Sequence, residues 1–596
     1  MMLMANKEIN WDLRAIFPSP TDPAIRTIIQ NLTKTAEDFS NKHRGKIENS
    51  TAEQLLQSIL EYESFRVKLD ELSLYSESAF SANMTLPETQ TLHDRVSKAE
   101  ASLNKKLAFF EIETGNHVKQ NTQLINDTVL KTYKHALERL KRQAAHRLSE
   151  IEEQLIIEKD QFGIRGWQQL QSKWLNTRMF QVEVEGKTKT LSYGEANGLL
   201  AHPDRKTRES ADKSIYTLLG KDGEIFSSAL RNICNDWLTL CERRKYDSPM
   251  HASLIDNDID QQTINNLLKA IENHVEVYRK YLKFKAKLMH LPKLANHDIV
   301  APLHDTPRIN FTFEAARELV TEAYGKFDED YAFAAKDMFK KSHIDASPRF
   351  GKQNGAFCSG WYNGKSAYIL SSFSGTLNDV FTLAHELGHA THAYYCEAEQ
   401  TIINTNIAMI VAEIASTFGE LLLADHLLNK AKTDQEKRAI LCFLLDEAGM
   451  AGFQVTARAW FEQHLYDAIK QGQFLDYKTI CGYWTQSRNR IYGEAVEWLD
   501  VMESEWAMKP HYYLPNFRFY NYPYVYAEMF VYALYQKYLE EGKAFVPKFK
   551  KMLAAGSSVS PVDIGKIVGF DVTAPDFWEL GMKQFERLLG ILEKIA

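Results

Sequence analysis

The segment TLAHELGHATH, residues 382–392, has two histidines four positions apart and a glutamate directly after the first. On an α-helix, positions i and i+4 lie on one face, so His385 and His389 can both reach one metal ion. Glu386 lies beside them and can accept a proton from an attacking water. The opposite, apolar face is predicted for Leu383, Leu387, Ala390 and Tyr394, with His392 on the side of the other histidines. The pattern predicts a helix that carries a Zn²⁺ site.

The residues before this helix predict a β-hairpin. AFCSGWYNGKSAYILSSF, residues 356–373, has strand-forming residues on both sides of Asn363-Gly364, a dipeptide typical of tight hairpin turns. Thr376 and Asp379 then fit a capping box, which predicts where the helix starts.

A catalytic zinc site needs a third protein ligand and one open position. The longer pattern with Gly at 392 and His at 395 is excluded, because these positions hold His392 and Tyr395. A following helix is predicted from apolar residues spaced four and three apart, namely Ile407, Val411, Ile414, Phe418 and Leu421. Glu413 and Glu420 share its opposite face, and either could be the third ligand. The alternative is that the histidines and both glutamates are only solvated surface residues.

The rest of the chain predicts mainly helices. Spacings of four and three separate the apolar residues Leu55, Ile59, Tyr62, Phe65 and Leu69, which predicts a helix there, and a short hairpin is predicted at residues 180–193. No linker of biased composition separates domains. We expect a helical N-terminal region at residues 1–200 and a larger region at 201–596 that carries the chemistry.

Composition excludes several classes of protein. Among 596 residues, 71 basic and 78 acidic side chains give a net charge of −7, which argues against general nucleic-acid binding. No run of about 18 apolar residues predicts a membrane span. The six cysteines form no CxxC pair, and the start of the chain has no apolar signal segment. These features predict a soluble, cytoplasmic protein with no membrane partner.

TLAHELGHATH followed by AEIASTFGE, residues 412–420, resembles the oligoendopeptidase F branch of the thimet oligopeptidase-like zinc metallopeptidase family. The resemblance covers nearly the whole chain. It extends to NWDLRAIFPS at 10–19, the helix at 148–170, the hairpin at 180–193, AFCSG at 356–360 and PHYY…FYNYPY at 510–524. Two segments depart from the family pattern, Ser372–Gly375 before the metal helix and Val525–Glu528 after the tyrosine cluster.

The resemblance implies a mainly α fold with two lobes that enclose a deep channel, and a few small β-hairpins near the active site. It also implies one Zn²⁺ per chain, with Glu413 as the third ligand and Glu420 at a nearby polar position. His511 and Tyr522 would close over the metal and donate hydrogen bonds to the substrate, with Tyr520 and Tyr524 as alternatives to Tyr522. Residues 201–596 would form the catalytic domain.

The function that this implies is a zinc-dependent endopeptidase acting on short oligopeptides, with Glu386 as the proton acceptor. We expect the strand just before the metal helix to bind the substrate main chain by strand addition. One alternative is a related helical HExxH zinc carboxypeptidase, which would need a site for the terminal carboxylate of its substrate. The other alternative is a non-catalytic helical binding protein. The sequence leaves the cleavage preference and the oligomeric state open.

Overall fold

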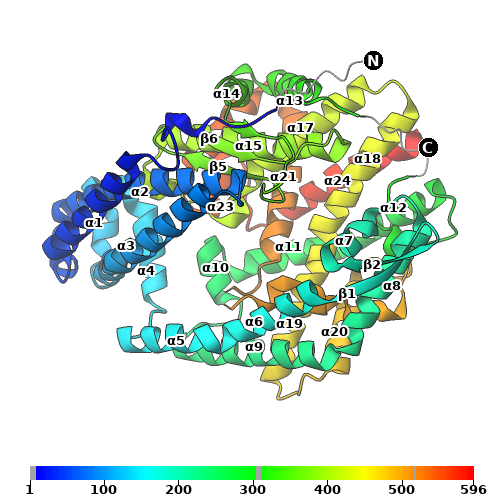
Figure 1. Cartoon of the computed structure of the whole chain (residues 1–596), viewed down its shortest axis with the longest axis horizontal. Helices are drawn as coiled ribbons and strands as arrows, with labels where there is room; N and C mark the ends of the chain where they lie inside the picture. Colours follow the sequence, from blue (N-terminus) through cyan, green and yellow to red (C-terminus); the bar gives the residue numbers. More distant parts are fainter. Residues whose placement is uncertain (1–7, 304–309, 516, 596) are drawn as a thin grey trace. The chain divides into compact units, whose positions relative to one another are not determined.

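The computed structural model describes residues 8–303, 310–515 and 517–595, and helices dominate it (Figure 1). This confirms the predicted mainly α fold with a few small strands. The chain divides into two compact units, each built from three separate segments. Unit 1 comprises Met1–Ala145, Arg308–Asn429 and Lys537–Phe570, and unit 2 comprises His146–Pro307, Lys430–Gln536 and Asp571–Ala596. These units do not follow the division at residue 200, which stays a prediction, as does the deep channel.

Unit 1 contains the metal helix and a small sheet. Its helices are α1 Pro23–His43, α2 Ala52–Ala82, α3 Pro87–Gln120, α4 Lys134–Ala144, α13 Phe313–Phe327, α14 Glu329–Lys340, α15 Leu377–Glu399, α16 Met409–Ala412, α17 Ile414–Lys430, α22 Val546–Ala555 and α23 Pro561–Ile567. Its strands are β4 Ile344–Asp345, β5 Phe357–Trp361 and β6 Ser366–Leu370.

The helices α1, α2 and α3 share one apolar core in unit 1 (Figure 1). The predicted stripe of α2 lies in it, with Leu55 and Leu69 fully buried. Because a buried stripe at spacings of three and four covers one side of a helix, the pattern predicted both the helix and its inner face.

The predicted hairpin is present as β5 and β6, which pair antiparallel with Ser359 opposite Tyr368. The sheet order is β4-β6-β5, so β6 is the central strand and β5 lies at an edge. Helix α15 packs against both hairpin strands. It begins where predicted, with Thr376 as N-cap in a capping box with Asp379.

The helix predicted around residues 407–421 is interrupted, which corrects the expectation of one continuous helix. Helix α16 ends at Ala412, and Glu413 has φ −82° and ψ 0° before α17 begins at Ile414. The backbone keeps its direction, because the Thr417 amide still donates to the Glu413 carbonyl at 3.1 Å. The side chain of Glu413 therefore projects from a local turn between α16 and α17 rather than from the face of a regular helix.

Unit 2 is helical apart from two small sheets. Its helices are α5 Glu150–Phe162, α6 Ile164–Thr177, α7 Tyr193–Gly198, α8 Arg205–Lys221, α9 Gly223–Arg244, α10 His251–Asn257, α11 Gln261–Asn273, α12 Val275–Leu288, α18 Asp434–Ala448, α19 Val455–Lys470, α20 Tyr477–Tyr492, α21 Tyr522–Glu541 and α24 Phe577–Lys594. Its strands are β1 Met179–Val184, β2 Lys187–Ser192, β3 Leu294–Ala295 and β7 Val496–Glu497. Strands β1 and β2 are the hairpin predicted at residues 180–193.

One helical stretch of the described residues, Asp434–Lys470, is long and apolar enough to cross a membrane by length and composition alone. Of its apolar window, 61% is buried inside the protein, as in the core helix of a globular domain. The stretch is weak support for a span, and the expectation of no membrane partner stays a prediction.

Candidate metal centre

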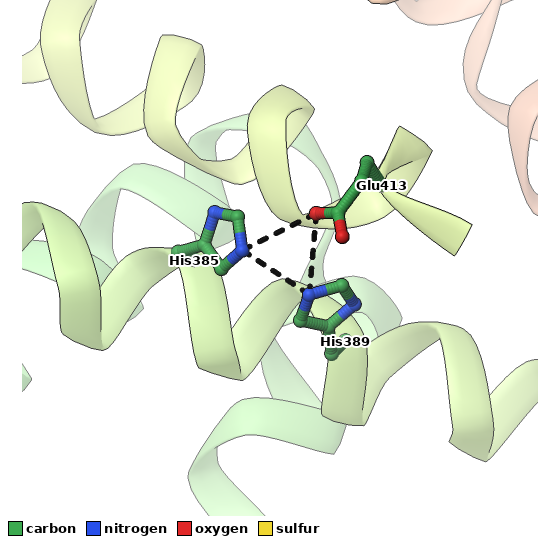
Figure 2. Close-up of side chains that lie close together, drawn as sticks. All are labelled: His385, His389 and Glu413. Carbon is green, nitrogen blue, oxygen red and sulfur yellow. Dashed lines mark hydrogen bonds and ion pairs between the residues drawn. The ribbon is translucent and has the colours of Figure 1, made fainter. Parts of the chain in front are cut away.

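Three side chains of unit 1 converge on one point (Figure 2). His385 Nε2 and His389 Nε2 lie 3.3 Å and 3.4 Å from Oε2 of Glu413, and the two nitrogens lie 3.2 Å apart. Ligands at tetrahedral corners, each 2.0–2.2 Å from a zinc ion, stand about 3.3–3.6 Å apart. The donor set and its spacing therefore fit a small divalent cation.

Close packing of α15 on α17 brings Glu413 and Glu420 to His385. A Cβ on Gly388, inside the HExxH motif, would lie 2.4 Å from the Ala415 carbonyl oxygen. Only a glycine lets the two backbones approach so closely. A Cβ on Gly419 would lie 2.1 Å from the Tyr324 hydroxyl, which donates to the Ala384 carbonyl at 2.6 Å.

Glu413 and Glu420, which the sequence left as alternatives, contact different atoms of His385. Glu413 faces Nε2, whereas Oε1 of Glu420 lies 2.5 Å from Nδ1. A carboxylate on the second ring nitrogen fixes the orientation and the tautomer of a ligating histidine. The geometry gives the two glutamates separate positions, one inside the ligand triangle and one behind it.

The electrostatics of this cluster favour positive charge. Burial opposes protonation of His385, but its bonds with Glu413 and Glu420 outweigh burial and raise its pKa well above the usual value. Burial also opposes ionisation of Glu413, yet bonds from the two histidines hold its pKa below the usual range. The group therefore attracts a cation to the point where the three side chains meet.

Glu386 points toward the same space. Its side chain is 5% exposed, and Oε2 has no hydrogen-bond partner within the described chain. Burial raises the pKa of Glu386. It lines a cavity of about 580 Å³ together with His385, His389 and Glu413. A buried carboxylate oxygen without a partner, next to a cation site, can exchange a proton with a reactant.

His392 lines the same cavity as His385 and His389, but its side chain is more deeply buried than theirs. It is 3% exposed and buried, and burial lowers its pKa to about 4. The expected apolar stripe is also wider than predicted, because α15 is covered on most sides, while Tyr394 is only half-buried. A helix that is packed on most sides has no solvated face. The pattern of polar and apolar residues in the sequence therefore predicted more exposed residues on α15 than the structure has.

The cavity is walled by α2, β5 and the segment before α16, with Asp70, Phe357, Trp361 and Ile407 among its lining. Because β6 lies between β4 and β5, the strand just before the metal helix has neighbours on both sides. The expectation that this strand accepts a substrate strand is therefore wrong. The strand at the edge of the sheet, β5, lines the cavity instead.

His511 and the tyrosine cluster lie in unit 2. Tyr522 is fully buried at the start of α21, and its hydroxyl is hydrogen-bonded to Ser253 and Asn257 at 3.1 Å and 3.3 Å. Tyr520 is half-buried and stacks on His511, with ring centroids 5.1 Å apart. The hydroxyl of Tyr522 thus has partners in the core of its own unit, whereas Tyr520 groups with His511.

Tyr524 extends this second group, because its ring lies 5.6 Å from that of Tyr520. Sequence spacing could not separate the three tyrosines. Only the start of α21 at Tyr522, which turns this side chain inward, distinguishes it from its neighbours.

Comparisons with known proteins agree with this architecture. The family described as Peptidase family M3 matches residues 199–584, and the one described as Oligopeptidase F matches residues 119–176. Oligopeptidase PepF of Bacillus subtilis is 27% identical, over 99% of this chain and 87% of its own length. An oligoendopeptidase F homolog of Lactococcus lactis is 25% identical, over 99% of this chain and 98% of its own.

Solved structures share the fold. A putative peptidase from Chlamydophila abortus superposes with a TM-score of 0.89 at 22% identity, covering 98% of both chains. Oligoendopeptidase-F from Enterococcus faecium gives a TM-score of 0.68 at 23% identity, covering 95% of this chain and 98% of its own.

Proposed function

This chain belongs to peptidase family M3, and from that premise we propose that it is a zinc-dependent endopeptidase that hydrolyses internal bonds of short oligopeptides. As a metallo-endopeptidase of this family it needs a metal, and His385, His389 and Glu413 form a group that fits one. The observation that carries the proposal is the ligand triangle beside the unpartnered carboxylate oxygen of Glu386. A structural metal site would not need an additional buried base.

Two imidazoles and one carboxylate are the donor set of many catalytic zinc sites, which supports zinc over Mg²⁺ or Ca²⁺. When bound, the ion would act as a Lewis acid that polarises the scissile carbonyl and lowers the pKa of a water. Glu420 would hold His385 in the tautomer that leaves Nε2 free to coordinate.

Glu386 moves the protons in the proposed mechanism. Its Oε2 takes a proton from the attacking water and then delivers it to the leaving amine nitrogen. The raised pKa of this buried carboxyl suits both steps, because a group with a pKa nearer neutrality can accept and return a proton.

We further propose that His511 and a tyrosine of the 520–524 cluster donate hydrogen bonds to the oxygen that becomes negative in the transition state. The grouping of His511 with Tyr520 favours Tyr520 for this role, since Tyr522 already has two hydrogen-bond partners. Substitution of each of the three tyrosines by phenylalanine compares Tyr522, the choice made from the sequence, with its neighbours.

Oligopeptides are the proposed partners. The edge strand β5 can pair with an extended main chain, which gives binding that depends little on sequence. We also propose a cytoplasmic location, on the composition of the chain alone.

The test is a digest of mixed-length peptides by the metal-loaded enzyme, read by mass spectrometry with and without a chelator. We expect internal cleavage that stops on chelation and returns with zinc. A peptide with an amidated C-terminus should still be cut. Strict loss of C-terminal residues, abolished by the amide, would favour the carboxypeptidase alternative. No metal on the purified chain and no cleavage after zinc addition would favour a binding protein.

A further inference from the structure

We propose that the cavity beside the metal centre is a specificity subsite for a basic substrate side chain, with Glu397 as the recognising carboxylate. This inference rests on the proposed peptidase function and names a substrate preference for it. The residues concerned all belong to unit 1.

Glu397 lies on the metal helix itself. It follows His389 by eight positions, about 12 Å along α15. It is 5% exposed and lines the same cavity as His385, Glu386 and His389. Its Oε2 has no hydrogen-bond partner among the described residues. A carboxylate that is buried, unpartnered and in a cavity wall lacks the counterpart that such groups normally have.

The surrounding backbone makes room for this carboxylate. A Cβ on Gly360 of β5 would lie 2.6 Å from Oε1 of Glu397. The glycine therefore lets the edge strand pass close to the acid. The backbone of Ser366 is a hydrogen-bond partner of the same carboxyl group, so the group is anchored on one side while Oε2 stays available.

The charges around the cavity favour a cation. Its described lining contains Asp70, Glu71 and Glu397 besides the metal centre, and no lysine or arginine. Asp70 pairs with Arg66 at 2.7 Å, and Glu71 accepts from the Trp361 indole at 2.7 Å. Among these three acids outside the metal centre, Glu397 is the buried one, and its Oε2 has no hydrogen-bond partner among the described residues.

Lys365 acts on Glu397 through its charge, but its ammonium group makes no hydrogen bond to Oε2 of the carboxyl group. Its Nζ donates to the main-chain carbonyl of Glu397 and lies 3.7 Å from the centre of the Tyr362 ring. Because its ammonium group is held by these contacts, Oε2 of Glu397 is left for a ligand.

The apolar part of the lining fits the stem of a long basic side chain. Leu74, Phe357, Trp361 and Tyr362 line the cavity together with Glu397. Lysine and arginine bury their methylene groups along such surfaces, and their charged ends are attracted to aromatic faces. An acidic side chain would instead be placed beside the carboxyl group of Glu397 with no lysine or arginine in the described lining to pair with it.

The pKa of Glu397 is that of a carboxyl group with no cation bonded to it in the free enzyme. Burial raises the pKa of Glu397 to about 8. An incoming ammonium or guanidinium group stabilises the ionised form and would release this proton. A neutral side chain gains no such ion pair.

The experiment uses zinc-loaded full-length enzyme and quenched fluorescent peptides that differ at one residue. The two residues before the scissile bond and the two residues after it are varied one at a time. Each of these positions carries lysine, acetyl-lysine, norleucine or glutamate in turn. Acetyl-lysine keeps the stem and removes the charge. We expect lysine to exceed both neutral residues in kcat/KM by about tenfold or more at one position, as a charge-assisted hydrogen bond provides.

Glu397→Gln keeps the shape of the side chain and should lower this lysine-to-norleucine ratio about tenfold. Glu399→Gln is the matched control, because Glu399 is exposed on the same helix and its ratio should not change. Cleavage with no preference for lysine over acetyl-lysine at any position would overturn the inference while leaving the peptidase function intact. An unchanged ratio in a folded, zinc-loaded Glu397→Gln would also overturn it. Absence of cleavage of every peptide would overturn the proposed function and this inference with it.

Discussion

Oε1 of Glu420 lies 2.5 Å from Nδ1 of His385, on the side of the ring opposite to Glu413. The imidazole is held between two carboxylates, one from Glu413 at the break between α16 and α17 and one from Glu420 within α17. Its orientation is thus fixed by the packing of α17 on α15, and this relationship makes the two glutamates experimentally separable.

Glu413→Ala should lose stable metal binding, because it removes one of three protein ligands. Glu420→Ala should weaken zinc affinity about 10- to 100-fold, as expected for a residue that orients a ligand. Competition with a chromogenic chelator measures both. If Glu420→Ala strips the zinc and Glu413→Ala does not, the two roles are reversed.

Glu386→Gln should keep the metal and lose turnover by about 10²–10⁴-fold, because the amide cannot accept the proton of water. Zinc content and kcat are measured on the same preparation. The surface variant Glu399→Gln controls for loss of one negative charge on α15. Substantial activity in a fully metallated Glu386→Gln would remove this residue as the base.

Tyr520→Phe should lower kcat and kcat/KM together by about 10²–10³-fold if its hydroxyl donates only in the transition state. Tyr522→Phe should instead cost about 1–2 kcal/mol of folding stability, since it leaves Ser253 and Asn257 without their shared partner. Kinetics and thermal denaturation of both variants, with Tyr524→Phe as a third, test this. A kcat loss confined to Tyr522→Phe would restore the choice made from the sequence.

Gly388→Ala should destabilise the fold by about 1–3 kcal/mol and weaken zinc binding, because its Cβ would meet the backbone of Ala415, which cannot move aside as a side chain can. Gly482→Ala is the matched control. It lies in the exposed part of α20 with nothing within 4 Å of its Cβ position, and it should stabilise the helix slightly. Equal melting temperatures for the two variants would contradict the close approach of α15 and α17.

Folding stability should fall as the pH drops from 6.5 to about 4, in part through His343. Burial lowers the pKa of this histidine to about 4, and its Nδ1 is bonded to Ser366 and Ala367 beside the central strand β6. The unfolded histidine takes up a proton near pH 6.5 while the folded one stays neutral, so the unfolded state gains the proton first.

The full effect of this difference in pKa is about 3 kcal/mol. Urea denaturation of wild type and His343→Asn at pH 7.5 and pH 5 captures about 2 kcal/mol of it, because the folded histidine takes up its proton only near pH 4, and the stability of the variant should depend less on pH. The same pH dependence in both proteins would show that other groups cause the loss.

Local patterns in the sequence determined much of this protein. The spacing of His385 and His389 fixed the face of α15 that carries the site, Thr376 and Asp379 fixed its start, and Asn363-Gly364 fixed the hairpin before it. These features depend on residues within a few positions of one another, where helical and strand periodicity give definite predictions. The same is true of the buried stripe of α2.

Only the tertiary structure decided which partner each of these residues meets. The spacing of Glu413 and Glu420 placed both on one helical face, and the break at Glu413 together with the close contact at Gly388 assigned them to different nitrogens of His385. Likewise, the third strand β4 left β5 rather than β6 at the edge, and the core of unit 2 took up the hydroxyl of Tyr522. Each of these outcomes depends on contacts between segments far apart in the chain, and periodicity within a single segment contains no information about them.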